Sequence, residues 1–174
     1  QAIEGVIEYS TTEGRKLYNS ARSRLDEELF DCNADGLDQI IQSLGHRASE
    51  YGWDNINEGI ISIPENQVDA NPEEYSILTE YGQLTMDRIW EYDNTYIDTA
   101  GRQAQNSYMM YQCLMSSISK EGKKKILIWK EDYTIDENKS GNLLLKTIIR
   151  ESHIDTNATT SNIRTKLSSL DTYI

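Results

Sequence analysis

Hydrophobic residues recur at helical spacing along most of the chain, and this pattern predicts a series of amphipathic helices. Residues three and four positions apart share one face of an α-helix, so apolar residues at that spacing mark the face that packs into a core. The first predicted helix runs from Thr11 to Phe30, with Thr11 or Thr12 as its N-cap. Its apolar positions are Leu17, Tyr18, Ala21, Leu25 and Leu29.

A second helix is predicted after the turn-forming stretch FDCNADG, with an apolar stripe at Leu37, Ile40, Ile41, Leu44, Ala48 and Tyr51. Residues 54–74 then contain both prolines and mostly polar side chains, so we expect a long loop with at most a short strand at Ile60 to Ile63. Ser76 to Tyr81 predicts a single helical turn.

The longest apolar periodicity predicts the central helix of the core, between Thr99 and Ile118. Burying about five large side chains at ~1.5–3 kcal/mol each would make it the main source of stability. Before it, Thr85 is expected to cap a shorter helix whose Ile89 and Trp90 point inward. The face of the central helix carries Ala100, Ala104, Tyr108, Tyr111, Leu114, Met115 and Ile118.

The last third of the chain predicts further helices. The segment KKKILIWK is either a short helix or, by its β-branched content, a strand, and we favour the helix. It is followed by a polar loop, DYTIDENKSG. A wide apolar face at Leu143, Leu144, Ile148 and Ile149 then needs burial, and a polar hinge at residues 153–157 separates it from a narrower stripe at Ile163, Leu167, Leu170 and Ile174.

Composition supports a folded, all-α chain. The 174 residues suit one domain or one domain with part of a second, and they include 37% hydrophobic and 26% charged residues. No apolar run approaches the ~18 residues that a membrane span needs, and the stretch QAIEGVIEYS lacks the features of a secretion signal. We therefore expect a cytoplasmic protein with no membrane partner.

Charge divides the chain unevenly. Residues 1–99 carry 6 Lys and Arg against 21 Asp and Glu, whereas residues 100–174 carry 11 against 8. The basic cluster is Lys120, Lys123, Lys124 and Lys125, which is more typical of a solvated helix face than of a phosphate site. An acidic region of one copy can steer toward this cluster in another, and nucleic-acid binding through Lys120 to Lys130 is the alternative.

Candidate catalytic and metal-binding residues are few. Asp98-Thr99-Ala100 is similar to the Asp-Thr-Gly of aspartic proteases, but it adjoins the strongest helical pattern, so Asp98 or Thr99 is better interpreted as an N-cap. His46 and His153 stand alone, and Cys32 and Cys113 lack the partners of a zinc site. We expect no enzyme activity, no cofactor and no small-molecule substrate. The eleven tyrosines fit either the edge of a core or an interface.

Four stretches together resemble the Gag polypeptide of copia-type LTR retrotransposons, of the kind found in diatoms and other marine microbial eukaryotes. The resemblance covers most of the chain, and its most specific part is RESHIDTNATTSNIRTKLSSLDTYI, followed by AGRQAQNSYMMYQCLMSSI. The two other stretches are KLYNSARSRL and FDCNADGLDQIIQSLGHRASEYGW.

This resemblance implies a capsid-like bundle that self-associates into a cytoplasmic shell around element RNA. Residues 1–138 would form the retroviral-capsid-type N-terminal domain, and residues 139–174 a helix-hinge-helix connector or the start of a C-terminal capsid domain. Self-association is expected through Ile163, Leu167, Leu170 and Ile174, and electrostatic contact through the lysine cluster. The chain departs from the family pattern in having no CCHC knuckle and no basic tail, so any link to RNA is indirect. The alternative is a domesticated Gag-derived helical adaptor that binds a partner without forming particles.

Overall fold

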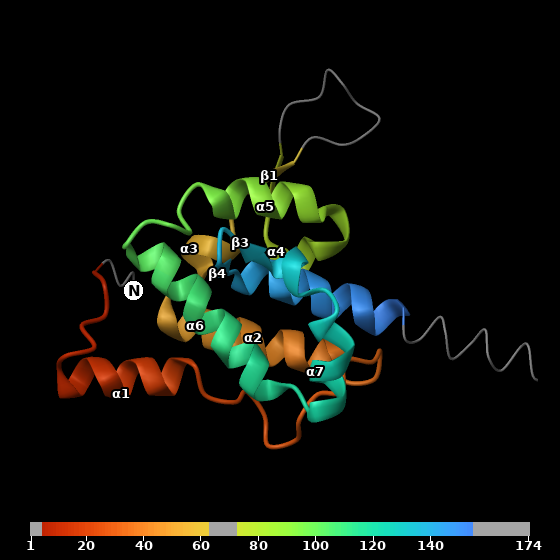
Figure 1. Ribbon diagram of the computed structural model, residues 1–174, viewed down its shortest axis with the longest axis horizontal. Coiled ribbons are helices and arrows are strands. Elements are labelled where there is room, and N and C mark those ends of the chain that lie inside the picture. The colour runs from red at the N-terminus through yellow and green to blue at the C-terminus, as the bar shows by residue number, and fades with distance from the viewer. Residues whose placement is uncertain (1–4, 63–72, 155–174) are drawn as a thin grey trace, which may run out of the picture.

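The computed structural model describes residues 5–62 and 73–154, which form a mostly helical fold with two short β hairpins (Figure 1). The first half contains α1 (Thr12–Ala21), α2 (Leu37–Tyr51), α3 (Asp54–Asn57), β1 (Ile60–Ser62), β2 (Glu73–Tyr75), α4 (Ile77–Glu80) and η1 (Tyr81–Gln83). The second half contains α5 (Met86–Asn94), α6 (Arg102–Ser117), α7 (Lys120–Leu127), η2 (Lys130–Tyr133), β3 (Thr134–Ile135) and β4 (Asn138–Lys139). Residues 141–154, blue in Figure 1, form another helix. The predicted all-α class is thus confirmed as a mostly helical fold.

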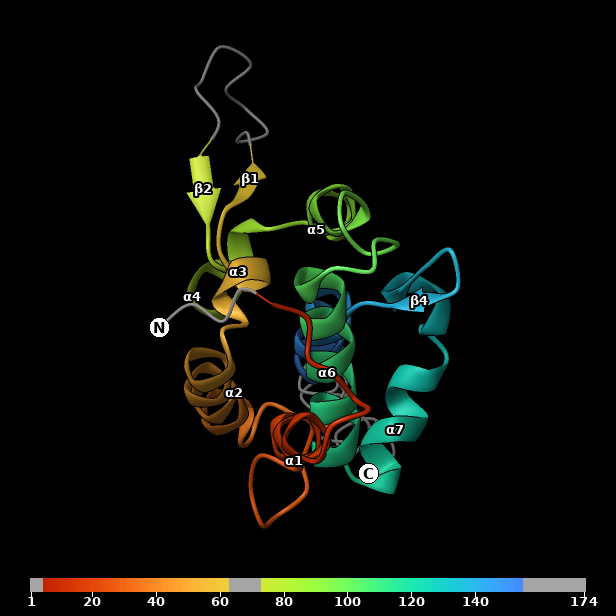
Figure 2. The same cartoon turned by 90° about the vertical axis from the view of Figure 1, so that its left-hand side faces the viewer.

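α6 lies in the middle of the helices, with α2 and α7 on opposite sides of it in Figure 2. Its fully buried apolar residues are Met109, Met110, Cys113 and Leu114. The prediction that Tyr108 faces the core is wrong, because this side chain is 45% exposed and its ring stacks on Tyr111 at a centroid distance of 6.0 Å. The unbranched methionines fill the core at the positions beside it.

The helix at residues 141–154 confirms the predicted wide apolar face. Leu143, Leu144, Ile148 and Ile149 are all buried. Its first residue, Gly141, packs directly on α6, where a Cβ would lie 2.6 Å from the Cβ of Met110. Glycine is therefore what allows the two backbones to approach this closely.

α1 is shorter than predicted, although its cap is correct: the side chain of Thr11 accepts a hydrogen bond from the N–H of Gly14. The helix ends at Ala21 instead of Phe30. Nη1 of Arg47, in α2, donates hydrogen bonds of 2.8 to 3.1 Å to three backbone carbonyls near the end of α1, those of Ser20, Ala21 and Ser23. The backbone of Phe30 pairs with the end of α6, so the intervening residues must leave the helix to reach it.

α2 and α5 follow their predictions at most positions. α2 begins and ends where the apolar stripe does, and Gly52 stops it in a left-handed conformation with φ of 76°. Thr85 caps α5 by accepting a hydrogen bond from the N–H of Arg88. Ile89 is fully buried as expected, but Trp90 is 42% exposed, so its predicted inward orientation is wrong.

The hairpin of β3 and β4 lies within a stretch predicted as a polar loop. Asp136 and Glu137 form its turn with φ of 47° and 72°. Positive φ values suit a tight hairpin turn, but glycine or asparagine usually occupies such positions. The residue types Asp and Glu therefore did not predict the hairpin. The predicted short strand at residues 60–63 is largely confirmed by β1, which pairs antiparallel with β2.

Two predictions fall partly or wholly outside the described residues. The first two residues of the predicted hinge, His153 and Ile154, still belong to the helix at residues 141–154, so this part of the prediction is wrong. The rest of the predicted hinge and the stripe of Ile163, Leu167, Leu170 and Ile174 lie within residues 155–174. The division of the chain at residue 138 therefore stays a prediction.

Candidate functional site

α7 is anchored to the rest of the fold by its first turn, and the side chains on its outer face are exposed. Ser119 caps the helix by accepting a hydrogen bond from the N–H of Gly122 at 3.1 Å, and its hydroxyl donates to the carboxylate of Asp31. Gly122 lies so close to α6 that a Cβ would be 2.3 Å from Cγ2 of Ile118. KKKILIWK is thus helical over its first five residues, as favoured.

The predicted lysine cluster lies along this helix. Lys120, Lys123 and Lys124 are exposed. Nζ of Lys124 lies 3.9 Å from Oε1 of Glu121, one turn earlier in the helix, and both side chains are exposed. Lys125 is partly buried and donates from Nζ to the backbone carbonyl of Asp31 at 3.0 Å. Three of the four lysines therefore face solvent, while the fourth helps to hold α7 in place.

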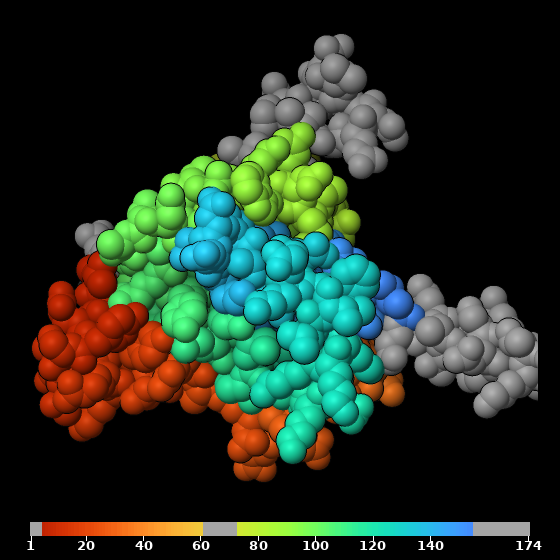
Figure 3. All heavy atoms as spheres, in the orientation of Figure 1, coloured from red at the N-terminus to blue at the C-terminus, as the bar shows by residue number. Residues whose placement is uncertain are grey.

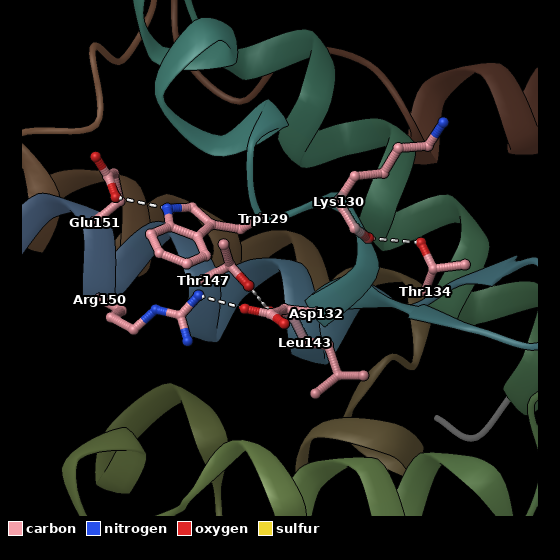
Figure 4. Close-up of polar contacts among 8 residues, drawn as sticks. All are labelled: Trp129, Lys130, Asp132, Thr134, Leu143, Thr147, Arg150 and Glu151. Carbon is pink, nitrogen blue, oxygen red and sulfur yellow. Dashed lines mark hydrogen bonds and ion pairs between the residues drawn. The ribbon is translucent and has the colours of Figure 1, made fainter.

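The chain after α7 turns back onto the helix at residues 141–154 through Trp129 (Figure 4). Its indole Nε1–H donates to Glu151 Oε2 at 3.0 Å, and the guanidinium carbon of Arg150 lies 4.7 Å from a ring centroid of the indole. Arg150 also pairs with Asp132 at 2.7 Å. These contacts hold the indole of Trp129 against the helix at residues 141–154, and they fix the direction in which Leu127 and Ile128 point.

Leu127 and Ile128 stand out from the fold at this place, and we call the pair the α7 tip. Ile126 before them is fully buried and Trp129 after them packs on the last described helix, so the two residues between point outward. Leu127 is 61% exposed and Ile128 is 74% exposed. Adjacent exposed aliphatic side chains beside charged residues are typical of an interaction surface.

A hollow of about 450 Å³ lies between the loop that follows α1 and the start of α2, and we call it the acidic hollow. Its apolar residues are Leu29, Phe30 and Ile40, of which Leu29 is 43% exposed. In Figure 3 the orange loop and the teal surface of α7 lie side by side at the lower edge of the molecule. Five carboxylate residues also line the hollow: Asp26, Glu27, Glu28, Asp31 and Asp35.

The sequence does not predict the acidic hollow, because the apolar pattern places residues 22–30 in a helix. In a helix, Asp26, Glu27 and Glu28 would spread around the axis. The acidic run Asp26-Glu27-Glu28 followed by Asp31 and Asp35 was the available hint. The pairing of Phe30 with the end of α6 and the hydrogen bond from Ser43 to Asp26 hold this run around the hollow.

Asp93 of α5 is the centre of a buried polar cluster. Its Oδ1 accepts hydrogen bonds from the hydroxyl of Tyr96 at 2.7 Å and from Nδ2 of Asn142 at 3.0 Å, while Oδ2 accepts from the hydroxyl of Ser140. Ser140 in turn accepts from the N–H of Leu143 and so caps the helix at residues 141–154. Burial raises the pKa of the Asp93 carboxyl to about 6, although its three hydrogen-bond donors oppose the rise.

A raised carboxyl pKa is typical of catalytic acids, but the position of Asp93 argues for a structural role. Its side chain is fully buried, and all three donors belong to residues that are also buried. A substrate has no access to this carboxyl in the described fold. The cluster instead joins α5 to the start of the last described helix.

The other candidate residues do not converge. Asp98 and Thr99 do not cap α6, because Gly101 occupies the cap position, and Asp98 is exposed in the preceding turn. His46 and His153 are both exposed. Within residues 5–62 and 73–154, no group of three or more His, Cys, Asp or Glu could hold a metal ion.

The tyrosines divide between core and surface. Tyr133 is buried and Tyr9 is 46% exposed, and Tyr9 packs edge-on against Tyr18. Tyrosines therefore occur both in the core and on the surface, and their role at an interface stays a prediction. No helix in the described part of the chain is long and apolar enough to cross a bilayer.

Comparison of the chain with protein-family models, with curated protein sequences and with solved structures gave no match. The similarity to copia-type Gag therefore stays an expectation based on the sequence stretches that carry it.

Proposed function

We propose that this chain is a structural, non-enzymatic subunit that associates with further copies of itself, of the capsid kind that a resemblance to copia-type Gag implies. The observation that carries the proposal is the α7 tip, where Leu127 and Ile128 are 61% and 74% exposed. Under this proposal the particles form in the cytoplasm and enclose RNA, and the shell contacts are made by protein surfaces.

A single contact through the α7 tip is weak. Fully burying a leucine or isoleucine contributes ~1.5–3 kcal/mol, so covering the exposed fractions of this pair contributes about 2–4 kcal/mol. Association costs ~4–15 kcal/mol in lost translational and rotational freedom. A stable assembly therefore needs several such contacts per subunit, which is how a shell gains stability from individually weak interfaces.

The test is the mass of the purified chain by light scattering, with negative-stain electron microscopy, across a series of protein and salt concentrations. We expect the mass to rise with protein concentration and regular particles to appear. Replacing both tip residues with serine (Leu127→Ser with Ile128→Ser) is expected to reduce the association. The matched control is Val6→Ser, which changes a 44% exposed aliphatic side chain elsewhere on the surface.

The result that contradicts the proposal is a monomer at every concentration. Such a monomer would favour the helical adaptor, and a search for a cellular partner would replace the search for particles. Association that the tip substitutions leave unchanged would mean that another surface carries it.

A further inference from the structure

We infer that the acidic hollow of one copy receives the α7 tip of a second copy. This inference rests on the proposed function, because it names the two surfaces through which self-association occurs. It commits the tip to a partner of the same sequence and gives each subunit one inserting surface and one receiving surface.

Charge complementarity is the first argument. Lys123 and Lys124 are exposed on α7 about one helical turn before the tip. Glu27 and Glu28 are exposed at the acidic hollow. When the tip enters the hollow, the lysines come close to these carboxylates, so opposite charges both steer the approach and fix the register of the contact.

The composition of the two surfaces is the second argument. The hollow is lined by Leu29, Phe30 and Ile40 as well as by acidic residues, and Leu29, which is 43% exposed, offers most of the accessible apolar contact. Its volume of about 450 Å³ falls within the ~300–1,000 Å³ of pockets that bind groups of drug size. Two aliphatic side chains fit this space. An apolar centre with a charged rim is the usual anatomy of a protein interface.

The placement of α7 indicates that the tip entering a given hollow comes from a second copy of the chain. The first turn of α7 is tied to Asp31, a residue of the hollow, through Ser119. The helix has eight residues and is therefore about 12 Å long, which carries its tip away from the hollow of the same chain. In Figure 1, α7 extends upward from its start beside the orange loop. A contact between tip and hollow must then join two molecules.

Two charge reversals test the inference. One variant carries Lys123→Glu with Lys124→Glu, and the other carries Glu27→Lys with Glu28→Lys. Each variant alone sets like charges against each other, so its association constant in sedimentation velocity is expected to fall at least about tenfold below that of the unchanged chain. An equimolar mixture of the two is expected to recover association, because each tip then meets a hollow of opposite charge.

All four changed residues are exposed, so both variants are expected to fold, and circular dichroism checks this. The matched control is Lys16→Glu with Glu50→Lys, which reverses exposed charges on α1 and α2 and is expected to associate like the unchanged chain. The recovery in the mixture is the decisive readout, because a general loss of stability could not produce it.

The outcomes separate this inference from the proposed function. If the unchanged chain never associates, both fail. If the unchanged chain associates and both reversal variants associate equally well, the inference is overturned while self-association stands. Weakened variants that do not recover on mixing also overturn it, since the lysines and glutamates would then act at different interfaces.

Discussion

Replacing Asp93 with asparagine tests the energetics of the buried polar cluster. The change removes the titrating group but keeps its shape. The remaining amide oxygen can accept the hydrogen bonds that Tyr96 and Asn142 donate to Oδ1, and the new amide nitrogen can donate to the hydroxyl oxygen of Ser140. The bond from the N–H of Leu143 to Ser140, which caps the last described helix, can therefore persist, although the Ser140 hydroxyl loses its carboxylate acceptor. The loss of that acceptor does not depend on pH, so the pH-dependent part of the stability difference reports the charge itself.

The size and sign of the effect follow from the pKa. Burial raises the pKa of Asp93 from 3.8 to about 6 in the folded chain, whereas the unfolded chain retains the ordinary value. Between these two values the folded state binds the proton more tightly, so the free energy of unfolding decreases as pH rises through this window. The whole window corresponds to about 3 kcal/mol, of which about 2 kcal/mol falls between about pH 4.5 and about pH 7.5.

The assay is urea unfolding of the wild type and of Asp93→Asn at both pH values, followed by circular dichroism. We expect the wild type to lose about 2 kcal/mol relative to the variant on going to the higher pH. Taking the difference between the two proteins cancels the titration of all other carboxylates. Asp98→Asn is the matched change at an exposed position. A difference that stays constant, or that changes with the opposite sign, would refute the assignment of a raised pKa to Asp93.

Three further predictions concern packing, capping and thiol reactivity. Gly122→Ala is expected to lower the free energy of unfolding by about 1–3 kcal/mol, because the added Cβ would lie 2.3 Å from Ile118. Gly45→Ala in α2 is the control, because its Cβ would meet no other atom, and it is expected to raise the free energy of unfolding by about 0.5–1 kcal/mol. Chemical denaturation measures both changes. Arg47→Met removes a cation from three carbonyls at the end of α1 and is expected to lower stability by about 2 kcal/mol in the same measurement, so an unchanged midpoint would contradict the role of this side chain. Cys113 is buried with its pKa raised by burial to about 12, so it is expected to resist a thiol reagent until the chain unfolds, and fast labelling of the native protein would count against this.

Local patterns predicted most helices correctly because helix formation depends mainly on neighbouring residues. The stripe from Leu37 to Tyr51 and the stop at Gly52 define α2 within the sequence itself. The same holds for the caps at Thr11 and Thr85, whose hydrogen bonds reach only three residues along the chain. These features need no knowledge of the rest of the fold.

The errors arose where distant residues decide the outcome. α1 stops at Ala21 because the residues after it form hydrogen bonds with distant parts of the chain. Arg47 donates to the carbonyl of Ala21, and the backbone of Phe30 pairs with the end of α6. Trp90 lies on an apolar pattern and is nevertheless 42% exposed, whereas its neighbour Ile89 is fully buried. Periodicity gives the existence of an apolar face but not the exact direction that it takes in the fold.

The candidate site shows the same division. The sequence located the lysines of α7 and the apolar residues that follow them, since both are contiguous. It could not identify which of Ile126, Leu127, Ile128 and Trp129 would be buried, because that choice depends on the contacts of Trp129 with the last described helix. It also gave no indication that Asp93 would be enclosed.

The sequence by itself therefore determined a mostly helical chain, the approximate positions and caps of its main helices and an uneven distribution of charge. These properties are set by composition and by interactions over a few residues. Only the tertiary structure decided where α1 ends, that Leu127 and Ile128 stay exposed, that five carboxylates gather around one hollow and that Asp93 is sealed inside. Each of these depends on contacts between segments far apart in the chain, and such contacts are fixed only when the whole core packs.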